Sequence, residues 1–600
     1  MVSRAFKLRV RRRFRIRKRQ VEAFGVQTEE QLERNFFRRL ERLREVRRFV
    51  AGWLLLVIMV GTLTIVQIRA LGGYYQTLQP VPGGILNEGI VGSFTNANPV
   101  YATSSVDQAV SKLIFAGLYT YDDHNQLVGD LADGPLQVNA DDTVYTAHLR
   151  PNLTWQDGAP LTAADVVYTF NVIQNPDAQS PLAASWQGIK VAALNATTVT
   201  FTLPDPLASF PYSLTTGIIP KHILGTTPMD EMRTVPFNTS SPVGAGPFVW
   251  RAIEVTGDSA DNRNERIALD PFQRYHAGSP KLGSFVVHSY RADSDMVTAF
   301  EHQEINAMAG LDEVPAKLRG DADVHSYSLP LTASVMTFFR TTDGILSDTA
   351  VRKALVQSAN VPAIITSLGY PAKAVTEPLL QGQLGYDASF AQPGFDLAAA
   401  NVALDADGWK LGTDGIRSKA NQPLTFKLYA QDTTEYAKVA AALKQQWRKA
   451  GVDLDVQLQG TADFQSTLTF HNYDALLYGI SIGADPDVYA YWSSTQIDGL
   501  GATRLNFSEY KSGAVDASLQ AGRTRTDPAL RAIKYRSFLQ SWQGDAPALG
   551  MYQPRFLYIT RGPLFGLKEH YMNVPADRYD SVSQWMIRQV PVSQADTTDN

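Results

Sequence analysis

Twenty consecutive residues without a charge, "FVAGWLLLVIMVGTLTIVQI" from Phe49 to Ile68, divide this chain of 600 residues into two unequal parts. A helix of that length spans about 30 Å, the thickness of the hydrocarbon core of a bilayer. The segment is therefore predicted to be a transmembrane helix. A cleaved signal peptide is the rival interpretation, but the basic stretch before it is long for that class, and no small-x-small cleavage site follows.

Charge is distributed unevenly on the two sides of this segment. Residues 1–50 contain 17 Lys and Arg against 6 Asp and Glu, whereas residues 51–600 contain 38 basic and 53 acidic side chains. Basic residues collect on the cytoplasmic side of a membrane span, so the N-terminus is predicted to be cytoplasmic and the large C-terminal part extracytoplasmic. The basic lead adjoins the span and is interpreted as a lipid-binding segment, with no nucleic-acid partner. Within it, residues 28–49 have helical apolar spacing and are predicted to lie on the membrane or to pair with a partner helix.

The exported part alternates short strands with amphipathic helices from Ile85 to about Ile587. This alternation predicts an α/β body, and its length exceeds what a single hydrophobic core fills, so more than one lobe is expected. The chain contains no cysteine, which excludes disulfides, thiolate metal sites, cysteine nucleophiles and a lipidated N-terminal cysteine.

One corner of the exported part can be predicted in detail from "LTWQDGAPLTAADVVYTF", residues 153–170. A strand precedes it, with Tyr145, Ala147 and Leu149 on one face, and the Asp157-Gly158 pair then favours a turn. Thr162 is a good N-cap, because Asp165 three residues later can complete a capping box. The apolar spacing from Val166 to Ile173 predicts a helix that ends at Pro176, with Trp155 buried in the corner.

Residue patterns that carry chemistry are weak. The nine histidines are scattered, and "FEHQEINAM" lacks the second histidine of a zinc-binding helix. The chain has no nucleophile elbow or phosphate-binding loop, and "DADGWKLGTDG" lacks two acids of a calcium loop, so a hairpin is predicted there. We therefore predict no catalytic residue, no metal site and no cofactor.

A family resemblance adds to this interpretation. "HLRPNLTWQDGAPLTAADVVYTF" resembles the signature of the family 5 extracellular solute-binding proteins, which serve as peptide and nickel receptors of ABC importers. Further stretches match in the same order, among them "SSPVGAGPFVW", "LSDTAVRKALVQSAN" and "GDAPALGMYQP". The resemblance covers roughly residues 85–587, and this collinear order makes it specific.

The resemblance implies a two-lobed type II periplasmic binding protein fold with an inserted extra domain, here preceded by one N-terminal transmembrane helix. The hinge is expected near Ser334–Met336 and Tyr552–Arg555. The expected division is a basic cytoplasmic segment at 1–48, a transmembrane anchor at 49–70, a linker at 71–84, lobe I at 85–100, 215–330 and 555–590, the inserted domain at 101–214, lobe II at 331–554, and a loose tail at 591–600.

The resemblance also implies a ligand site between a loop near the N-terminus of the body and a loop of lobe II. In peptide receptors of the family, the second loop carries a Gly-Trp pair and an aspartate that binds the peptide's α-amino group. Here Ile480 replaces that tryptophan, and the nearest acids are Asp485 and Asp487, of which Asp485 is the favoured amine partner. One of the two acids is expected to be the N-cap of a helix that starts at Pro486. The expected ligand-binding residues are Thr103, Ser104, Ser105, Tyr478, Gly479, Ile480, Ser481, Asp485, Asp487, Tyr489, Trp492 and Tyr552.

The functional expectation is a membrane-anchored substrate-binding protein of an ABC importer, most plausibly one that captures peptides. Its expected partners are the solute, the permease subunits, and the lipid bilayer through residues 49–70. Two alternatives remain open: a receptor for a metal chelate, haem or sugar on the same fold, or a ligand sensor that does not transport.

Overall fold

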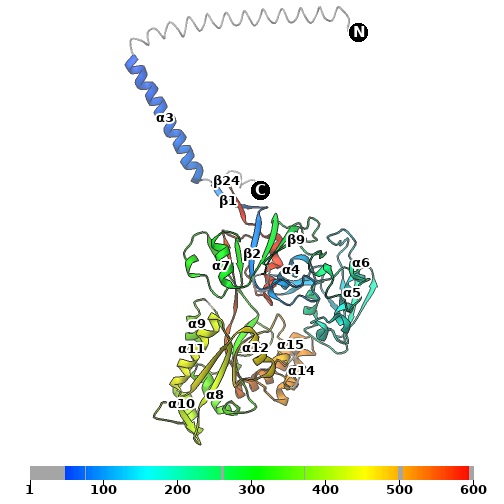
Figure 1. The fold of residues 1–600 in the computed structure, drawn as a ribbon, viewed down its shortest axis with the longest axis vertical. Coiled ribbons are helices and arrows are strands. Elements are labelled where there is room, and N and C mark those ends of the chain that lie inside the picture. The colour runs from blue at the N-terminus through cyan, green and yellow to red at the C-terminus, as the bar shows by residue number, and fades with distance from the viewer. Residues whose placement is uncertain (1–46, 75, 258–262, 371, 498–503, 594–600) are drawn as a thin grey trace, which may run out of the picture. The chain divides into compact units, whose positions relative to one another are not determined.

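The computed structural model describes residues 47–74, 76–257, 263–370, 372–497 and 504–593 (Figure 1). Residues 80–588 form one compact unit, and residues 1–79 together with 589–600 form another. The helix predicted within residues 28–49 lies almost wholly outside the described residues, as do residues 594–600.

Helix α3 (Arg47–Tyr74) contains the apolar run. Within it, Arg48–Gln67 is long and apolar enough to cross a membrane, with a mean hydropathy of 2.5; a signal sequence can have the same length and composition. The hydroxyl of Thr64 donates a hydrogen bond to the carbonyl oxygen of Val60 (2.7 Å), and the hydroxyl of Thr62 bonds to that of Ile58 in the same way. These polar groups are thus satisfied inside their own helix, as an apolar surrounding requires.

The segment predicted as a linker at 71–84 contains regular secondary structure. Helix α3 continues to Tyr74, and strand β1 (Gln76–Val81) follows it and pairs with β24 (Arg588–Ser593). Residues 591–593 of the predicted loose tail therefore belong to a strand. Pairing with a distant part of the chain satisfies the backbone groups of both segments, and local sequence does not reveal such a partner.

A seven-stranded sheet forms the upper half of the body in Figure 1. Its central strand β2 lies parallel to both β11 and β12, and helix α7 (Asp293–Glu301) connects β11 to β12. All seven strands come from the segments expected for lobe I, and we call this sheet with its helices lobe I. In spatial order the strands are β13 (Val324–Pro330), β23 (Arg555–Arg561), β12 (Ala307–Ala309), β2 (Ile85–Val91), β11 (Ser284–Tyr290), β10 (Asn264–Pro271) and β9 (Phe248–Thr256).

A six-stranded sheet forms the lower half, and we call it with its helices lobe II (Figure 1). Strand β19 is parallel to β20 and β21, and helices α11 (Thr434–Lys449) and α12 (Thr461–Phe470) make the two connections. Side chains of β14 alternate between two buried faces, Val335 and Phe339 on one and Met336 and Phe338 on the other. In spatial order the strands are β15 (Lys373–Ala374), β22 (Ala548–Gln553), β14 (Ala333–Phe339), β21 (Ala475–Ser481), β19 (Thr425–Gln431) and β20 (Asp453–Gln459).

The remaining helices of lobe II surround this sheet. The Asp405–Gly415 stretch ends α10 and forms a hairpin with β16 and β17, as predicted. The elements are α8 (Thr349–Ser358), α9 (Val361–Ser367), α10 (Leu397–Ala406), β16 (Lys410–Leu411), β17 (Arg417–Lys419), β18 (Gln422–Pro423), α13 (Tyr489–Trp492), α14 (Gly513–Arg523) and α15 (Pro528–Asp545).

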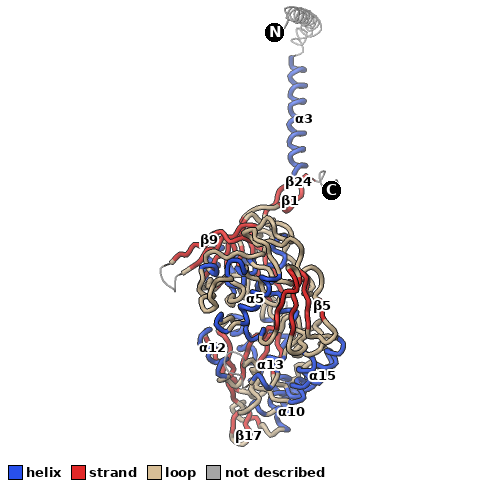
Figure 2. The backbone as a smooth tube through the Cα atoms, turned by 90° about the vertical axis from the view of Figure 1, so that its right-hand side faces the viewer, coloured by secondary structure: helices blue, strands red, loops and turns tan. Residues whose placement is uncertain are grey.

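Residues 101–214 contribute a separate antiparallel sheet, seen in Figure 2 as the group of strands that includes β5. We call this region the insert. Its core is aromatic: the rings of Phe170 and Trp186 stack with centroids 3.9 Å apart, and Phe201 packs edge-on against Phe170. The elements are α4 (Ser105–Ile114), β3 (Tyr119–Tyr121), β4 (Leu127–Gly129), β5 (Gln137–Val138), β6 (Val144–His148), α5 (Ala163–Gln174), β7 (Lys190–Asn195) and β8 (Thr198–Thr202), with α6 (Lys221–Leu224) directly after them.

The predicted corner is confirmed. Trp155 is completely buried, and Gly158 occupies the left-handed turn position with φ +96°. The carboxylate of Asp165 accepts the backbone N–H of Thr162 (2.8 Å), and α5 begins at the next residue, Ala163. Gln156, whose role the sequence did not reveal, donates its amide to the carbonyl oxygens of Ile114, Gly246 and Phe248 and so joins the corner to its neighbours.

The Gly-x-Gly-Pro segment has a packing reason for its glycines. A Cβ atom added at Gly244 would lie 2.0 Å from the carbonyl oxygen of Ile114, and one added at Gly246 would lie 2.7 Å from the carbonyl carbon of the same residue. Only glycine permits the end of α4 to pack this closely against the entry to β9.

Candidate ligand cleft

Two chain segments cross between the seven-stranded and the six-stranded sheet. Strand β13 leads into β14 through Leu331 and Thr332, and β22 leads into β23 through Pro554. The first crossing therefore precedes the predicted Ser334–Met336, which lies inside β14, whereas the second falls within Tyr552–Arg555. Backbone hydrogen bonds hold the first crossing against lobe II: the N–H groups of Ile482 and Gly483 both donate to the carbonyl oxygen of Thr332 (2.9 and 3.0 Å).

The carboxyl ends of the parallel strands carry the loops where lobe I and lobe II meet. In lobe II, α11 begins after β19; in lobe I, the 312–313 loop follows β12. Lys438 of α11 pairs with Glu313 of that loop (3.5 Å). Ligands of open α/β sheets bind at such carboxyl edges, so this junction is where a ligand site is expected.

A cavity of about 640 Å³ opens between the insert and lobe II. We call it the cleft cavity. Thr332 and Gln553 of the two crossings contribute to its wall, and Tyr571 closes it from the C-terminal segment. Its other lining residues are 124–127, Leu136, Val138, Tyr145, Ala208, Pro211, Tyr212, 380–384, 484–486, Thr526, Pro528 and Arg531. A volume of this size is within the usual range for small-molecule sites.

Asp485, the favoured amine partner, reaches the cleft cavity but already has a cationic partner. Its two carboxylate oxygens each accept a hydrogen bond from Arg531 of α15 (both 2.7 Å), and the side chains of both residues are only 6% exposed. The third guanidinium donor of Arg531, Nε, binds the carbonyl oxygen of Gly522 (2.9 Å). The pair is thus a bidentate, buried ion pair within lobe II.

Asp487 is also paired, at the contact between lobe II and the insert. Its carboxylate lies 3.1 Å from Arg523 Nη2 and accepts the hydroxyl of Ser209 (3.1 Å). It also accepts the backbone N–H of Tyr489 (3.3 Å), the first residue of α13. The expected helix start at Pro486 is wrong: α13 begins three residues later with Val488 as its N-cap, so neither acid is the N-cap.

Tyr489 lies under Arg523, whose guanidinium carbon is 4.4 Å from the ring centroid. This cation–π contact and the nearby Asp487 fix Arg523 at the edge of the cleft. One face of the Tyr489 ring is therefore covered by the guanidinium of Arg523. The carbonyl oxygen of Arg523 accepts the backbone N–H of Ala208 of the insert (2.8 Å), which is a second contact between lobe II and the insert.

The loop expected to contribute Thr103, Ser104 and Ser105 forms the start of α4. The hydroxyl of Ser104 accepts the N–H of Asp107 (3.0 Å) and is the N-cap of this helix, while Thr103 and Ser105 are exposed. None of the three lines the cleft cavity. Their binding role stays a prediction, and for Ser104 the cap accounts for the hydroxyl.

Tyr478, Gly479, Ile480 and Ser481 form the end of β21. Tyr478 and Gly479 are half-buried, Ile480 is buried in the core, and Ser481 is exposed with its hydroxyl directed to the carbonyl oxygen of Asn573 (3.4 Å). None of them lines the cleft cavity. The first lining residue after this strand is Ala484. Their binding role stays a prediction.

Two of the expected aromatic residues belong to the core. Trp492 is completely buried among Phe338, Phe538 and Trp542. Tyr552 is also completely buried, and its hydroxyl donates to Glu435 (2.7 Å). Neither side chain has a surface left for a solute in this conformation, and their binding role stays a prediction.

Several cleft residues were not found from the sequence. Tyr571, Tyr212 and Gln383 line the cavity, and the amide of Gln383 donates to the carbonyl oxygen of Gly483 (2.8 Å). Asn573 connects four regions: it accepts the hydroxyl of Thr332 (2.7 Å), donates to Asn125 of the insert (2.8 Å), and accepts from Ser481 through its carbonyl. No local motif marks these residues, because each contributes through a partner more than 90 residues away.

A buried carboxyl lies six residues before Gln383 in the chain. Glu377 is completely buried; its Oε1 accepts the N–H of Asp387 (3.2 Å), and its Oε2 has no partner among the described residues. Burial raises the pKa of the Glu377 carboxyl from its ordinary value of 4.5 to about 8, and the nearby Asp387 carboxylate adds to this effect.

We expect this group to make stability depend on pH. The folded protein retains the Glu377 proton up to about pH 8, whereas the unfolded chain loses it near 4.5. The free energy of unfolding should therefore fall across that interval, by roughly 3–5 kcal/mol in total. Glu377→Gln removes this titration. The melting temperature of the variant minus that of the wild type should therefore increase between pH 5 and pH 9. Parallel melting profiles of the two proteins would contradict the buried, protonated state.

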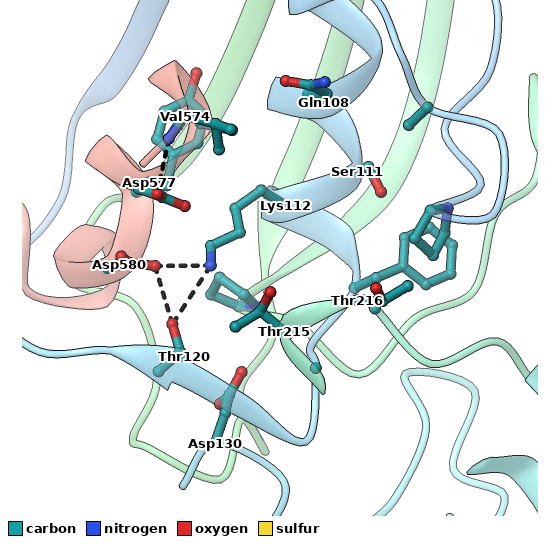
Figure 3. Close-up of a pocket in the computed structure, with 18 of the residues that line it drawn as sticks. Gln108, Ser111, Lys112, Thr120, Asp130, Thr215, Thr216, Val574, Asp577 and Asp580 are labelled. Atoms are coloured by element: carbon teal, nitrogen blue, oxygen red, sulfur yellow. Dashed lines mark hydrogen bonds and ion pairs between the residues drawn. The ribbon is translucent and has the colours of Figure 1, made fainter. Parts of the chain in front are cut away.

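A second cavity of about 280 Å³ lies between the insert and the C-terminal segment of lobe I (Figure 3). Lys112 of α4 pairs with Asp580 (2.7 Å), and Thr120 donates to the same carboxylate (3.0 Å). Burial and the charge of Asp580 raise the pKa of Asp577 to about 6, although its carboxylate accepts the N–H groups of Asn573 and Val574. This cavity shares no lining residue with the cleft cavity, and its charges mainly bind one another.

One group in the described part of the chain has the spacing of metal ligands: Asp122, Asp123 and His124. Each carboxylate already has protein partners. Asp123 pairs with Lys568 (3.0 Å), and Asp122 accepts the N–H groups of His124 and Gln126. The arrangement is that of a turn between β3 and β4, stabilised by its own side chains.

Comparison with known proteins identifies the family. The model described as "Bacterial extracellular solute-binding proteins, family 5 Middle" matches residues 126–499, more than half of the chain. This chain belongs to the family 5 solute-binding proteins. The resemblance inferred from the sequence is thereby confirmed, and the family is one of extracytoplasmic receptors, not of enzymes.

Individual relatives of this family 5 protein agree with the assignment. Protein XP55 of Streptomyces lividans is 28% identical over 479 residues, which cover 78% of this chain and 81% of that protein. The oligopeptide-binding protein AppA of Bacillus subtilis is 23% identical and covers 85% of this chain and 93% of its own.

Solved structures confirm the two-lobed fold. AppA in complex with a nonapeptide superposes with a TM-score of 0.68 at 22% identity, covering 85% of this chain and all of that one. NikZ of Campylobacter jejuni, solved with Ni(L-His), superposes with a TM-score of 0.71 at 23% identity, covering 84% of this chain and 99% of that one. Family 5 members with this fold thus hold ligands as different as a nonapeptide and a nickel complex.

Proposed function

We propose that this protein is a membrane-anchored receptor that captures peptides in the cleft between its lobes and delivers them to an ABC permease. The cleft cavity carries this proposal, because it is bounded by the insert, lobe II, both crossings and Tyr571. A solute held there contacts parts of the chain that come close to one another only when the lobes close. These added contacts favour the closed state. The relative AppA, named for oligopeptide binding, supports peptides as the solute class.

The anchor belongs to the same proposal. Arg48–Gln67 has the length and composition of a membrane span, and none of its described side chains is buried in the protein. A chain without a lipidated cysteine needs another way to stay near its permease, and an uncleaved helix provides it. The N-terminus would then be cytoplasmic and residues 80–588 extracytoplasmic, according to the distribution of basic residues.

Native mass spectrometry of the full chain in detergent tests the peptide assignment. We expect co-purified masses that correspond to peptides of mixed sequence and narrow length, because a receptor that binds the peptide backbone selects length more than side chains. A single defined non-peptide mass would instead assign a chelate, haem or sugar ligand. Protein that is recovered without ligand, and that shows no change in melting temperature with peptide pools, would contradict peptide capture.

A further inference from the structure

The charges around the cleft cavity indicate which kind of peptide end it accepts, and this inference rests on the proposed function. Among the described residues that line the cavity, the formally charged side chains are Asp485 and Arg531. They bind each other through two hydrogen bonds of 2.7 Å. The remaining lining is apolar, aromatic or amide-bearing, with His124 at an exposed margin. The wall therefore carries no net charge at this point.

An incoming ammonium group would gain little from Asp485. The guanidinium of Arg531 cancels the attraction of the carboxylate, whereas the ammonium would still lose its hydration on entering a partly enclosed site. Displacing Arg531 is also unfavourable, since its Nε is bound to the carbonyl oxygen of Gly522 and its side chain is 6% exposed. The favoured amine partner is thus already used inside lobe II.

The neighbouring acid is no better placed. Asp487 pairs with Arg523 at 3.1 Å and also accepts Ser209 and the N–H of Tyr489. Next to the lining residue Tyr571, Lys373 donates to the hydroxyl of that tyrosine, and its ammonium lies 5.1 Å from the ring centroid. A cation near the cavity wall makes the surroundings of Tyr571 still less favourable for a second ammonium group.

We propose that the cleft cavity selects peptides whose amino end carries no charge, such as N-acylated peptides. Such an end offers a carbonyl acceptor and an amide donor, which match the tyrosine hydroxyls and backbone groups of the wall. Apolar walls formed by Leu127, Leu136, Val138 and Leu380 suit the acyl group.

Matched peptide pools test this selectivity on the full chain in detergent. The first pool holds random pentapeptide amides with free amino ends, and the second holds the same sequences after N-acetylation. We expect the acetylated pool to bind more tightly than the free pool, with a Kd lower by about threefold or more. Titration calorimetry measures both values at one pH near 7, where the free amino ends are largely protonated.

The outcomes separate this inference from the proposed function. If acetylation leaves the Kd within about threefold or raises it, the charged amino end is accepted equally well or better and the inference is overturned, while peptide capture stands; a rise of about tenfold or more would indicate that an acidic group pairs with the amine. If neither pool binds, the inference and the peptide assignment both fail. Binding of both pools within the expected ratio supports both.

Discussion

Replacing Arg578 by methionine should lower the free energy of unfolding by about 3–5 kcal/mol, because it leaves a buried carboxylate without its cation. Glu88 lies on β2, the central strand of lobe I, and is completely buried. One of its oxygens accepts Arg578 Nη2 (2.6 Å) and the hydroxyl of Tyr579, and the other accepts the hydroxyl of Tyr558 (2.6 Å). Arg578 thus joins the C-terminal segment to the middle of the sheet.

A double variant distinguishes charge from packing in this cluster. Glu88→Gln combined with Arg578→Met has no buried charge left, and its stability should recover by more than half relative to the single Arg578→Met variant. Urea unfolding followed by tryptophan fluorescence is a suitable measurement, since Trp585 is buried with its ring 5.9 Å from that of Tyr579. Equal destabilisation in the single and double variants would indicate that the loss comes from packing alone.

Arg531→Gln should be the second most damaging substitution, with an expected loss of about 3–5 kcal/mol. It removes both bonds to the buried Asp485 and the bond that connects α15 to Gly522 at the end of α14. Because Asp485 lines the cleft cavity and loses its cation, affinity for peptides with free amino ends should rise relative to acetylated ones, even though stability falls. Thermal unfolding, without peptide and with each of the two peptide pools, measures both effects on the same sample.

The same helix supplies a matched control for Arg531. Arg536 also lies on α15 and pairs with an aspartate, Asp387, at 3.0 Å, but its side chain is 57% exposed. Exposed ion pairs contribute about 0–1 kcal/mol, so Arg536→Gln should change the melting temperature only slightly. If the two glutamine variants lose equal stability, burial is not what makes the Asp485–Arg531 pair important.

Much of the local structure could be predicted from sequence because its causes are local. The alternation of Tyr145, Ala147 and Leu149 predicted the buried face of β6, and Thr162 with Asp165 predicted the start of α5. The apolar run from Phe49 predicted the single long apolar helix of the described chain. Neighbouring residues alone determine periodicity, turn chemistry and helix caps, so these features remain readable without a fold.

Sequence reasoning did not find the contacts whose partners are distant in the chain. The predicted linker at 71–84 contains β1, whose strand partner β24 lies about 500 residues later. Asp485 was assigned to a ligand amine, but Arg531, 46 residues away, binds it. Tyr571 and Asn573 were missed, since only the folded chain brings them to the crossings at Thr332.

The sequence by itself determined the family, the α/β class, the apolar helix and the buried corner at Trp155, because motif order and local periodicity survive without any knowledge of contacts. The tertiary structure decided which charges are free. Whether an acid can bind a ligand depends on the cation that folding places beside it, and for Asp485 that cation is Arg531, at 2.7 Å. Charge pairing is a property of distances in space, and spacing along the chain does not fix those distances.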